Sequence, residues 1–180
     1  GILLVYTCAI ALMGFGALTA AVAPTVWVAL PCMVLGGAGN GAAVVYSMAG
    51  SLWRQRLDSD EAIELTHGPG YDYQPDWSPD GRFLLYDDHV TGRFQDLLIV
   101  KKEGGAPIPF LATEADESPG RFSPDGKWIV YRSADPGGRS EVFVRDFAPD
   151  RSPAYGSEKV QVSVSGGDKP RWSRDGREIF

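Results

Sequence analysis

The stretch Trp77-Ser-Pro-Asp-Gly-Arg-Phe-Leu-Leu-Tyr86 returns almost unchanged as Phe122-Ser-Pro-Asp-Gly-Lys-Trp-Ile-Val-Tyr131. A third and more divergent copy reads Trp172-Ser-Arg-Asp-Gly-Arg-Glu-Ile-Phe180. The aromatic residue that opens each copy recurs after 45 residues and then after 50 residues. Repeats of about 40–50 residues that contain several short strands are typical of the blades of a β-propeller. The repeat therefore predicts an architecture, and by itself it says little about chemistry.

Ser-Pro-Asp-Gly is the sequence of a tight turn. Proline pre-sets φ at the second turn position, as expected for Pro79 and Pro124. Glycine supplies the positive φ that closes a bulged hairpin, as expected for Gly81 and Gly126. In the third copy Arg174 replaces the proline, so that turn is less pre-organised.

A strand is expected after each turn. Phe83 and Leu85 would point to one face of the first such strand, and Leu84 and Tyr86 to the other. Both faces are apolar, which indicates a strand covered by neighbouring sheets on both sides. In the third copy Glu178 breaks this pattern. Further strands are expected at Leu97–Lys101, Ile108–Leu111, Glu141–Phe147 and Val160–Val164, with Ser51–Leu57 and Ala62–Leu65 as the outer half of an earlier blade.

The first fifty residues have a different composition, because no charged residue precedes Arg54. Residues 1–22 and 26–47 form two apolar runs separated by Ala23-Pro-Thr25, and each run of about 20 residues could cross a bilayer. A signal peptide fits less well, since there are two runs and no basic leading segment. A buried pair of helices in a soluble domain is the other alternative.

These observations predict two domains. Residues 1–50 would form an α-helical transmembrane hairpin, with the lipid bilayer as the partner of residues 1–47. Residues 51–180 would form a mainly β domain, a partial β-propeller of about two and a half to three four-stranded blades. The glycine-rich segment Gly36-Gly-Ala-Gly-Asn-Gly41 lacks the spacing of a dinucleotide-binding fingerprint, and it suits close packing between helices.

Candidate catalytic and metal-binding residues are few. His67 and His89 are expected in loops, and no G-x-S-x-G nucleophile motif is present. Asp87 and Asp88 could bind a cation with His89, although adjacent carboxylates on a loop are usually solvated. The recurring aspartates, Asp80, Asp125 and Asp175, are explained by the turn. We therefore expect no enzyme activity, no catalytic residue, no metal site and no cofactor.

The net charge argues against a nucleic-acid partner, and the positions of the cysteines argue against a disulfide or a metal site. The formal net charge is −6, which argues against a nucleic-acid partner, because binding nucleic acid requires clustered Lys and Arg. Cys8 and Cys32 fall inside the apolar runs and are expected to be small buried hydrophobic residues.

The three motifs carry a family resemblance. Pro75-Asp-Trp-Ser-Pro-Asp-Gly81, Arg121-Phe-Ser-Pro-Asp-Gly126 and Lys169-Pro-Arg-Trp-Ser-Arg-Asp-Gly176 resemble the TolB-like, WD-repeat-like β-propeller family over residues 51–180. The resemblance implies a platform for protein binding or sensing, with no shared catalytic residues. Residues 159–172 are similar to the propeller tails of bacterial serine/threonine kinases. Residues 1–47 resemble a transmembrane helix pair of the major facilitator superfamily, although two helices cannot form an alternating-access pore.

The expected function is that of a membrane-tethered propeller fragment that binds a protein or peptide partner. One alternative is the sensory propeller tail of a membrane serine/threonine kinase. Another is the accessory propeller of a peptidase whose catalytic domain lies outside this chain. The expected location is the membrane, with the propeller on the extracytoplasmic (periplasmic) side. A fragment, or a fusion of two unrelated pieces, is expected because Gly1 is not an initiator methionine and the third copy stops before its tyrosine.

Overall fold

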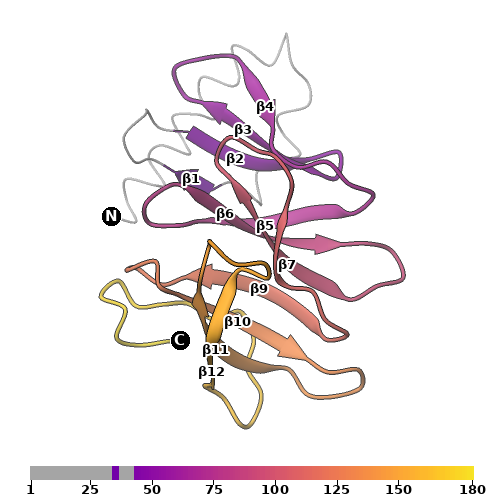
Figure 1. Cartoon of the computed structure of the whole chain (residues 1–180), viewed down its shortest axis with the longest axis vertical. Coiled ribbons are helices and arrows are strands. Elements are labelled where there is room, and N and C mark those ends of the chain that lie inside the picture. Colours follow the sequence, from indigo (N-terminus) through magenta and orange to yellow (C-terminus); the bar gives the residue numbers. More distant parts are fainter. Residues whose placement is uncertain (1–33, 37–42) are drawn as a thin grey trace, which may run out of the picture. The chain divides into compact units, whose positions relative to one another are not determined.

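The computed structural model describes residues 34–36 and 43–180 (Figure 1). The chain divides into two compact units, residues 1–31 and 32–180, and every described residue belongs to the second unit. Its strands form three four-stranded antiparallel sheets, in each of which consecutive strands are neighbours. We call these sheets blades 1, 2 and 3. The mainly β architecture and the four-stranded blades predicted from the repeat are confirmed.

The strands follow the chain in order. Blade 1 contains β1 (Val34–Gly36), β2 (Ala43–Met48), β3 (Ser51–Arg56) and β4 (Ala62–Glu64). Blade 2 contains β5 (Tyr71–Trp77), β6 (Phe83–His89), β7 (Gln95–Lys101) and β8 (Ile108–Leu111). Blade 3 contains β9 (Asp116–Phe122), β10 (Trp128–Ala134), β11 (Glu141–Phe147) and β12 (Tyr155–Gln161).

The Ser-Pro-Asp-Gly segments are the expected turns. Gly81, Gly126 and Gly176 have φ values of 67°, 71° and 71°. In the first turn the Gly81 amide donates to the Ser78 carbonyl at 2.8 Å. The Ser78 hydroxyl donates to Asp80 at 2.6 Å and accepts from the Phe83 amide at 2.9 Å. The serine and aspartate therefore fix the turn by hydrogen bonds, and the aspartate has the structural role predicted for it.

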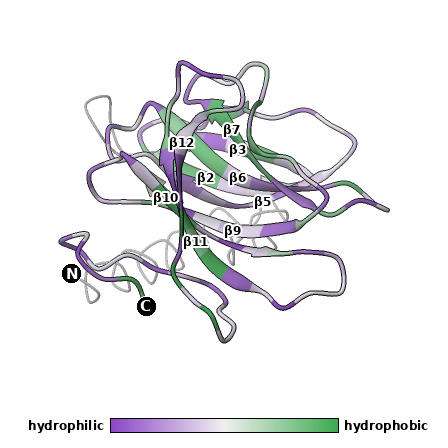
Figure 2. Cartoon of the chain, turned by 60° about the horizontal axis from the view of Figure 1, so that its bottom comes forward, coloured by the Kyte–Doolittle hydropathy of each residue, from purple (hydrophilic) through white to green (hydrophobic). Residues whose placement is uncertain are grey.

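Blade 2 is packed between its two neighbours, as its apolar second strand predicted. Leu84 and Tyr86 of β6 lie in a core cluster with Leu52 of blade 1. On the opposite face, Phe83 and Leu85 lie in a second cluster, shared with blade 3. Blade 3 contributes Phe122, Ile129 and Tyr131 to that cluster, and Ala154, which lies just before β12, also belongs to it. Figure 2 shows the hydrophobic colour gathered along the middle strands, with much of the hydrophilic colour on the connecting loops.

The structure corrects the prediction for the end of the N-terminal segment. Residues 34–36 and 43–48 form strands of blade 1, and β2 pairs with β3 from Ala43↔Arg56 to Met48↔Ser51. Ala49 and Gly50 both have positive φ, as a two-residue hairpin turn requires. A strand buried on both faces has the same continuous apolar sequence as part of a buried helix, which explains the error. Blade 1 thus begins before residue 50.

The remainder of the predicted hairpin, residues 1–33 and 37–42, lies outside the described residues. Within residues 34–36 and 43–180, no helix has the length and apolar character needed to cross a membrane.

The last expected outer strand is also displaced. It occupies residues 155–161 as β12, where the prediction placed it at residues 160–164. Tyr155 packs edge-on against Phe110 of blade 2, with ring centroids 6.0 Å apart, so the strand begins where it can contribute to the core. The third sequence copy forms a hairpin closed by a single bridge between Trp172 and Ile179.

Candidate functional site: the inner strands

β5 and β9 are the first strands of blades 2 and 3, and they contact each other where the sheets meet. Each of these strands ends at the aromatic residue that opens a repeat. The residues immediately before these aromatic residues are Asp76, Arg121 and Arg171. We call these three the inner-strand row, because the repeat places them at equivalent positions of successive units.

The backbone beside the row is strained. Gln74 and Lys169 have φ values of 52° and 50°, which few residues other than glycine adopt. Both residues precede a proline at the same position of their repeats. The β5–β6 register also shifts between Tyr73 and Asp76. Strain of this kind persists only where the surroundings impose it, and it is concentrated at functional sites.

Hydrogen bonds connect the row to neighbouring units. Arg121 Nη1 donates to the carbonyl of Gly120 at 2.5 Å and to that of Gln74 at 3.3 Å. The Phe122 amide donates to Asp76 Oδ2 at 2.8 Å. The Trp172 indole N–H donates to the Arg121 carbonyl at 3.2 Å. The row therefore lies on a backbone held in register across three units.

The charges of the row influence one another. Burial raises the pKa of Asp76, while the Phe122 amide and the two arginines oppose that rise. Burial and the neighbouring Arg171 lower the pKa of Arg121. Arg171 is exposed. Asp76 and Arg121 are half-buried and already make hydrogen bonds. The guanidinium group of Arg171 is therefore the member of the row most open to polar groups of a peptide, such as a carboxylate or a backbone carbonyl.

A second group of acidic residues lies at the other end of β5 and β6. The Thr66 hydroxyl donates to Asp72 Oδ2 at 2.5 Å, and burial raises the pKa of Asp72 to about 6. Asp87 is fully buried and accepts from the Ser118 hydroxyl at 2.5 Å. Burial raises the pKa of Asp87 to about 7. These carboxyl groups link blade 2 to the chain on either side of it.

The structure contradicts the loop placement of Asp87 and Asp88. Both residues belong to β6, and alternate residues of a strand point to opposite faces. Asp87 faces Ser118 of blade 3, whereas Asp88 interacts with Asp72. The two carboxylates therefore diverge and do not converge on one cation. No group of three metal-ligating side chains occurs among the residues that the structure describes.

The two histidines lie apart from the inner-strand row. His67 is in the exposed loop after β4, with Nδ1 3.3 Å from Glu64 Oε2. His89 was also expected in a loop, but it is the last residue of β6 and pairs with Tyr71 and Gln95 on the adjacent strands. The aromatic residues that open the repeats are core anchors, as expected. Trp77, Phe122 and Trp172 each belong to, or pack on, one of the three core clusters.

Sequence reasoning did not identify Gln74 or Lys169 as special, and it considered Asp87 only as a possible cation ligand on a loop. The recurrence of Gln74-Pro75 and Lys169-Pro170 before an aromatic residue was the available signal for a shared backbone conformation. The burial of Asp87 had no local signal, because it depends on Ser118, which lies 31 residues away in the chain.

Comparison with known proteins supports this architecture. The chain superposes on TolB from Acinetobacter baumannii with a TM-score of 0.61 and 19% identity, covering 76% of this chain and 34% of TolB. The described part has the fold of a TolB-like β-propeller. It also superposes on a puromycin-hydrolyzing peptidase of Mycobacterium tuberculosis, with a TM-score of 0.59 and 17% identity. That match covers 73% of this chain and 22% of the peptidase.

Two curated proteins are similar in sequence, and no family model matches the chain. The uncharacterized protein Atu1656 of Agrobacterium fabrum is 28% identical over 139 residues, which cover 71% of this chain and 45% of that protein. The uncharacterized peptidase YuxL of Bacillus subtilis is 30% identical over 84 residues, covering 47% of this chain and 13% of the peptidase. The chain thus spans less than half the length of either relative.

Proposed function

We propose that this chain is a non-catalytic scaffold that binds a protein or peptide through the inner-strand row. The observation that carries the proposal is the meeting of strained backbone and charged side chains at one edge of the TolB-like blades. Asp76, Arg121 and Arg171 come from separate repeats, so a partner that contacts all three must span successive units. An extended peptide has the length and the regularly spaced polar groups for such contacts.

Site-specific crosslinking tests this proposal. A photoreactive amino acid is placed at Gln74 or Lys169 of the full chain, and the matched control carries it at Arg151, in the exposed turn after β11. We expect a discrete adduct from cell-envelope proteins at the two inner positions and none at Arg151. Unlabelled chain should compete for the adduct, and Arg171→Gln should reduce its yield. Equal adducts at all three positions would contradict the proposal.

A second function is favoured by the peptidases found among both the sequence relatives and the similar structures. The chain would then be an accessory propeller whose catalytic partner is a hydrolase domain outside these residues. Mass spectrometry of the crosslinked adduct distinguishes the two functions, because an accessory propeller should label a hydrolase domain. Both functions require the chain alone to lack turnover on peptide, ester and nucleotide substrates. Turnover that disappears in His67→Ala or His89→Ala would contradict both.

We also propose that the segment before β1, residues 1–33, attaches the chain to a lipid bilayer and that the blades lie on the periplasmic side. The uncharged, apolar composition before Arg54 supports the attachment. Carbonate extraction of membranes should leave the full chain in the pellet and release residues 34–180, and protease added to spheroplasts should cleave the blades. Release of the full chain would contradict the attachment. The kinase sensory tail and the absence of a nucleic-acid partner stay predictions from the sequence.

A further inference from the structure

Three aspartates lie side by side on the face of blade 2 that packs toward blade 1. Asp72 of β5 pairs with Asp88 of β6, and Asp88 pairs in turn with Asp96 of β7. Directly opposite residues of antiparallel strands have their side chains on one face, and like charges at such positions repel. The face is that of Leu84 and Tyr86, which precede Asp88 by four and two residues in β6. We call the three residues the aspartate ladder.

The ladder is crowded at its Asp72 end. Asp72 is 6% exposed, and a Cβ atom on Gly70 would lie 2.1 Å from Asp88 Oδ1. The carboxyl groups of Asp72 and Asp88 lie within hydrogen-bonding reach of each other. Two ionised carboxylates cannot form this bond, because neither has a proton to donate. One member of the pair must therefore be protonated for the bond to exist.

Asp72 also joins the start of blade 2 to blade 1. Its amide donates to the Gly50 carbonyl at 2.9 Å, and its carbonyl accepts from the Ser47 hydroxyl at 2.6 Å. Its carboxyl group accepts from the Thr66 hydroxyl at 2.5 Å, and the same hydroxyl oxygen accepts from the Leu52 amide at 2.9 Å. The carboxyl group is thus part of a junction between the β2–β3 hairpin, the loop after β4 and the first strand of blade 2.

The surroundings of Asp72 favour its protonated form. Burial raises its pKa from 3.8 to about 6; the Thr66 hydroxyl opposes that rise, and Asp88 adds to it. Burial raises the pKa of Asp88 as well, but the hydrogen bond with Asp72 opposes that rise. Asp72 is therefore the donor of the shared proton, and Asp88 is the acceptor.

The cations within blade 2 act on the other two members of the ladder. Arg93, in the exposed loop after β6, opposes the rise that burial causes in the pKa of Asp88 and of Asp96. His89 acts on Asp88 in the same direction. Tyr86 is an uncharged neighbour on this face, because burial raises its pKa.

Blade 1 and the loop after it contact Asp72 through uncharged side chains. Among the described residues these contacts are made by Ser47 and Thr66. The cationic side chains of this part of the chain have other partners, which are the Lys102 carbonyl for Arg54, Asp58 for Arg56 and Glu64 for His67.

We propose that the aspartate ladder is a pH-sensitive switch of the junction between blades 1 and 2. While Asp72 carries a proton, its carboxyl group bridges Thr66 and Asp88 and holds the start of β5 on the β2–β3 hairpin. Loss of that proton to water places three carboxylates side by side on a largely buried face. Their repulsion then separates residues 66–72 from the hairpin. The inference does not depend on the proposed function, because it involves no member of the inner-strand row.

The direction of the response follows from the pKa of Asp72 in the two states. In the open state Asp72 is solvated and returns to its ordinary pKa of 3.8, whereas in the closed state the pKa is about 6. The closed state is therefore fully favoured below about pH 4, becomes less favoured as pH rises toward 6, and changes no further above it. Since one pKa unit corresponds to a tenfold change in an equilibrium, opening should increase by up to about a hundredfold.

Hydrogen exchange of the full chain, followed by NMR and corrected for the intrinsic effect of pH on amide exchange, tests the switch. At pH 7 we expect the amides of Asp72 and Leu52 to exchange at least about tenfold faster than that of Leu85 in the centre of β6, because the junction opens locally. Asp72→Asn imitates the protonated form, since its side chain accepts from Thr66 and donates to Asp88. It should slow the exchange of both junction amides by up to about a hundredfold at pH 7.

Two further variants make the test specific. Asp88→Asn should also keep the junction closed at pH 7, because its amide can donate to an ionised Asp72. Asp87→Asn is the matched control, since Asp87 lies on the opposite face of β6 and bonds Ser118, and it should leave the pH response of the junction amides unchanged.

Three outcomes would overturn the proposal. The first is equal exchange of the junction amides in the wild type and Asp72→Asn at pH 7. The second is exchange of the junction amides at the rate of Leu85, because opening would then be global. The third is protection at pH 7 that added Ca²⁺ restores in the wild type, which would show that the ladder closes on a cation and not on a proton.

Discussion

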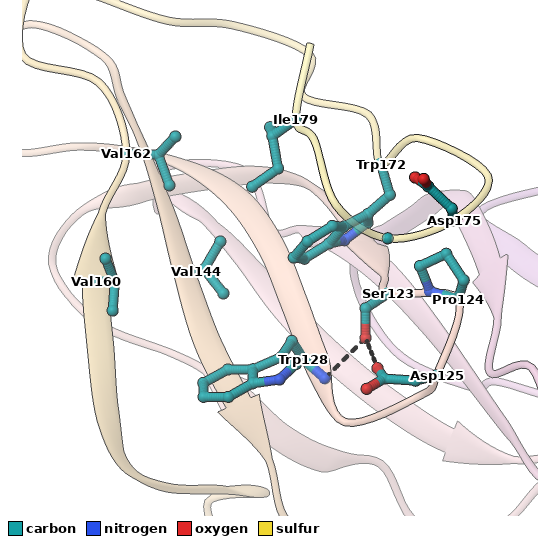
Figure 3. A pocket seen from close by; sticks show the side chains of 11 residues that line it. Ser123, Pro124, Asp125, Trp128, Val144, Val160, Val162, Trp172, Asp175 and Ile179 are labelled. Carbon is teal, nitrogen blue, oxygen red and sulfur yellow. Dashed lines mark hydrogen bonds between the residues drawn. The ribbon is translucent and has the colours of Figure 1, made fainter.

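The smallest structural unit that recurs in this fold is the hydrogen-bond network of one turn. Ser123 illustrates it, since its hydroxyl donates to Asp125 at 2.6 Å and accepts from the Trp128 amide at 3.0 Å (Figure 3). The hydroxyl of Ser123 and the amide of Lys127 hold the pKa of Asp125 below its ordinary value. The third turn makes equivalent bonds through Ser173 and Asp175 although it lacks the proline. Serine, aspartate and glycine are therefore sufficient to form the turn.

Substitution of the turn glycine should destabilise the chain. Gly126 has a φ of 71°, and a Cβ atom there would be in van der Waals contact with Pro79 of the preceding turn. We expect Gly126→Val to cost roughly 1–3 kcal/mol of unfolding free energy, because a β-branched residue resists positive φ. Gly126→Asn should cost less, and Gly68→Ala, in an exposed loop, should have little effect. Urea denaturation of the three variants measures the order, and equal stabilities would exclude the proposed turn geometry.

Asp87 should make the stability of the chain depend on pH. Its pKa rises from 3.8 to about 7 in the folded chain, so the folded state retains a proton that the unfolded state has lost. Stability from this group is therefore complete below about pH 4, decreases as pH rises toward 7, and is constant above it. Asp87→Asn keeps an acceptor for Ser118 and removes the titration.

The test compares unfolding of the wild type and Asp87→Asn between pH 4 and 8. The asparagine variant should become the more stable protein at pH 8, and the two stabilities should converge at low pH. Parallel pH profiles would contradict a raised pKa for Asp87.

Residues whose conformation depends on near neighbours were predictable, and those that depend on distant partners were not. Gly81 and Gly126 could be assigned positive φ because the turn motif is contained in four residues. Asp87 follows Tyr86 in a sequence that turns from apolar to acidic, which is typical of the end of a strand. Its burial is caused by blade 3, whose position no local pattern encodes.

At the scale of elements, the second strand of each blade contributes most to the core. Leu84 and Leu85 are adjacent in β6 and nearly fully buried, yet they belong to clusters on opposite sides of blade 2. A strand with two buried faces must have consecutive apolar residues, and this identified β6 and β10 correctly. The same property misled the prediction for β2, where Ala43, Val44 and Val45 follow a longer apolar run. Composition alone does not separate a two-sided strand from a helix.

Truncation of one β6 side chain should measure the contact between blades 1 and 2. Leu84 is 0% exposed, so Leu84→Ala should cost about 2–5 kcal/mol through lost burial and a residual cavity. The matched control is Leu57→Ala, because Leu57 is 51% exposed, and that change should cost less than about 0.5 kcal/mol. Thermal and urea unfolding of both variants would show the difference. Similar costs would mean that blade 1 does not cover blade 2 in solution.

At the scale of the whole molecule, each blade depends on a neighbour to cover its apolar faces. β3 and β4 alone provide only part of the cover for blade 2, since Val45 of β2 belongs to the same cluster as Leu84. A fragment of residues 51–180 would therefore expose the edge of β3 and part of the face of blade 2. Unpaired strand edges recruit other chains through backbone hydrogen bonds.

We expect the fragment of residues 51–180 to self-associate more strongly than the fragment of residues 32–180, which retains all of β1 and β2. Light scattering at increasing protein concentration measures the difference. If both fragments stay monomeric at every concentration, β1 and β2 are not required to complete blade 1.

The stacking of the turns, with Gly126 on Pro79 and Gly176 on Pro124, has an evolutionary consequence. Both surfaces of that contact are encoded within one four-residue turn, so each turn can receive the next copy of itself. Tandem duplication of the gene segment for one unit would create a new unit whose junction is compatible from the start. A lineage could therefore lengthen or shorten such an array by whole units without first evolving a new interface. Substitutions such as Arg174 and Glu178 could then specialise a unit after it had been copied.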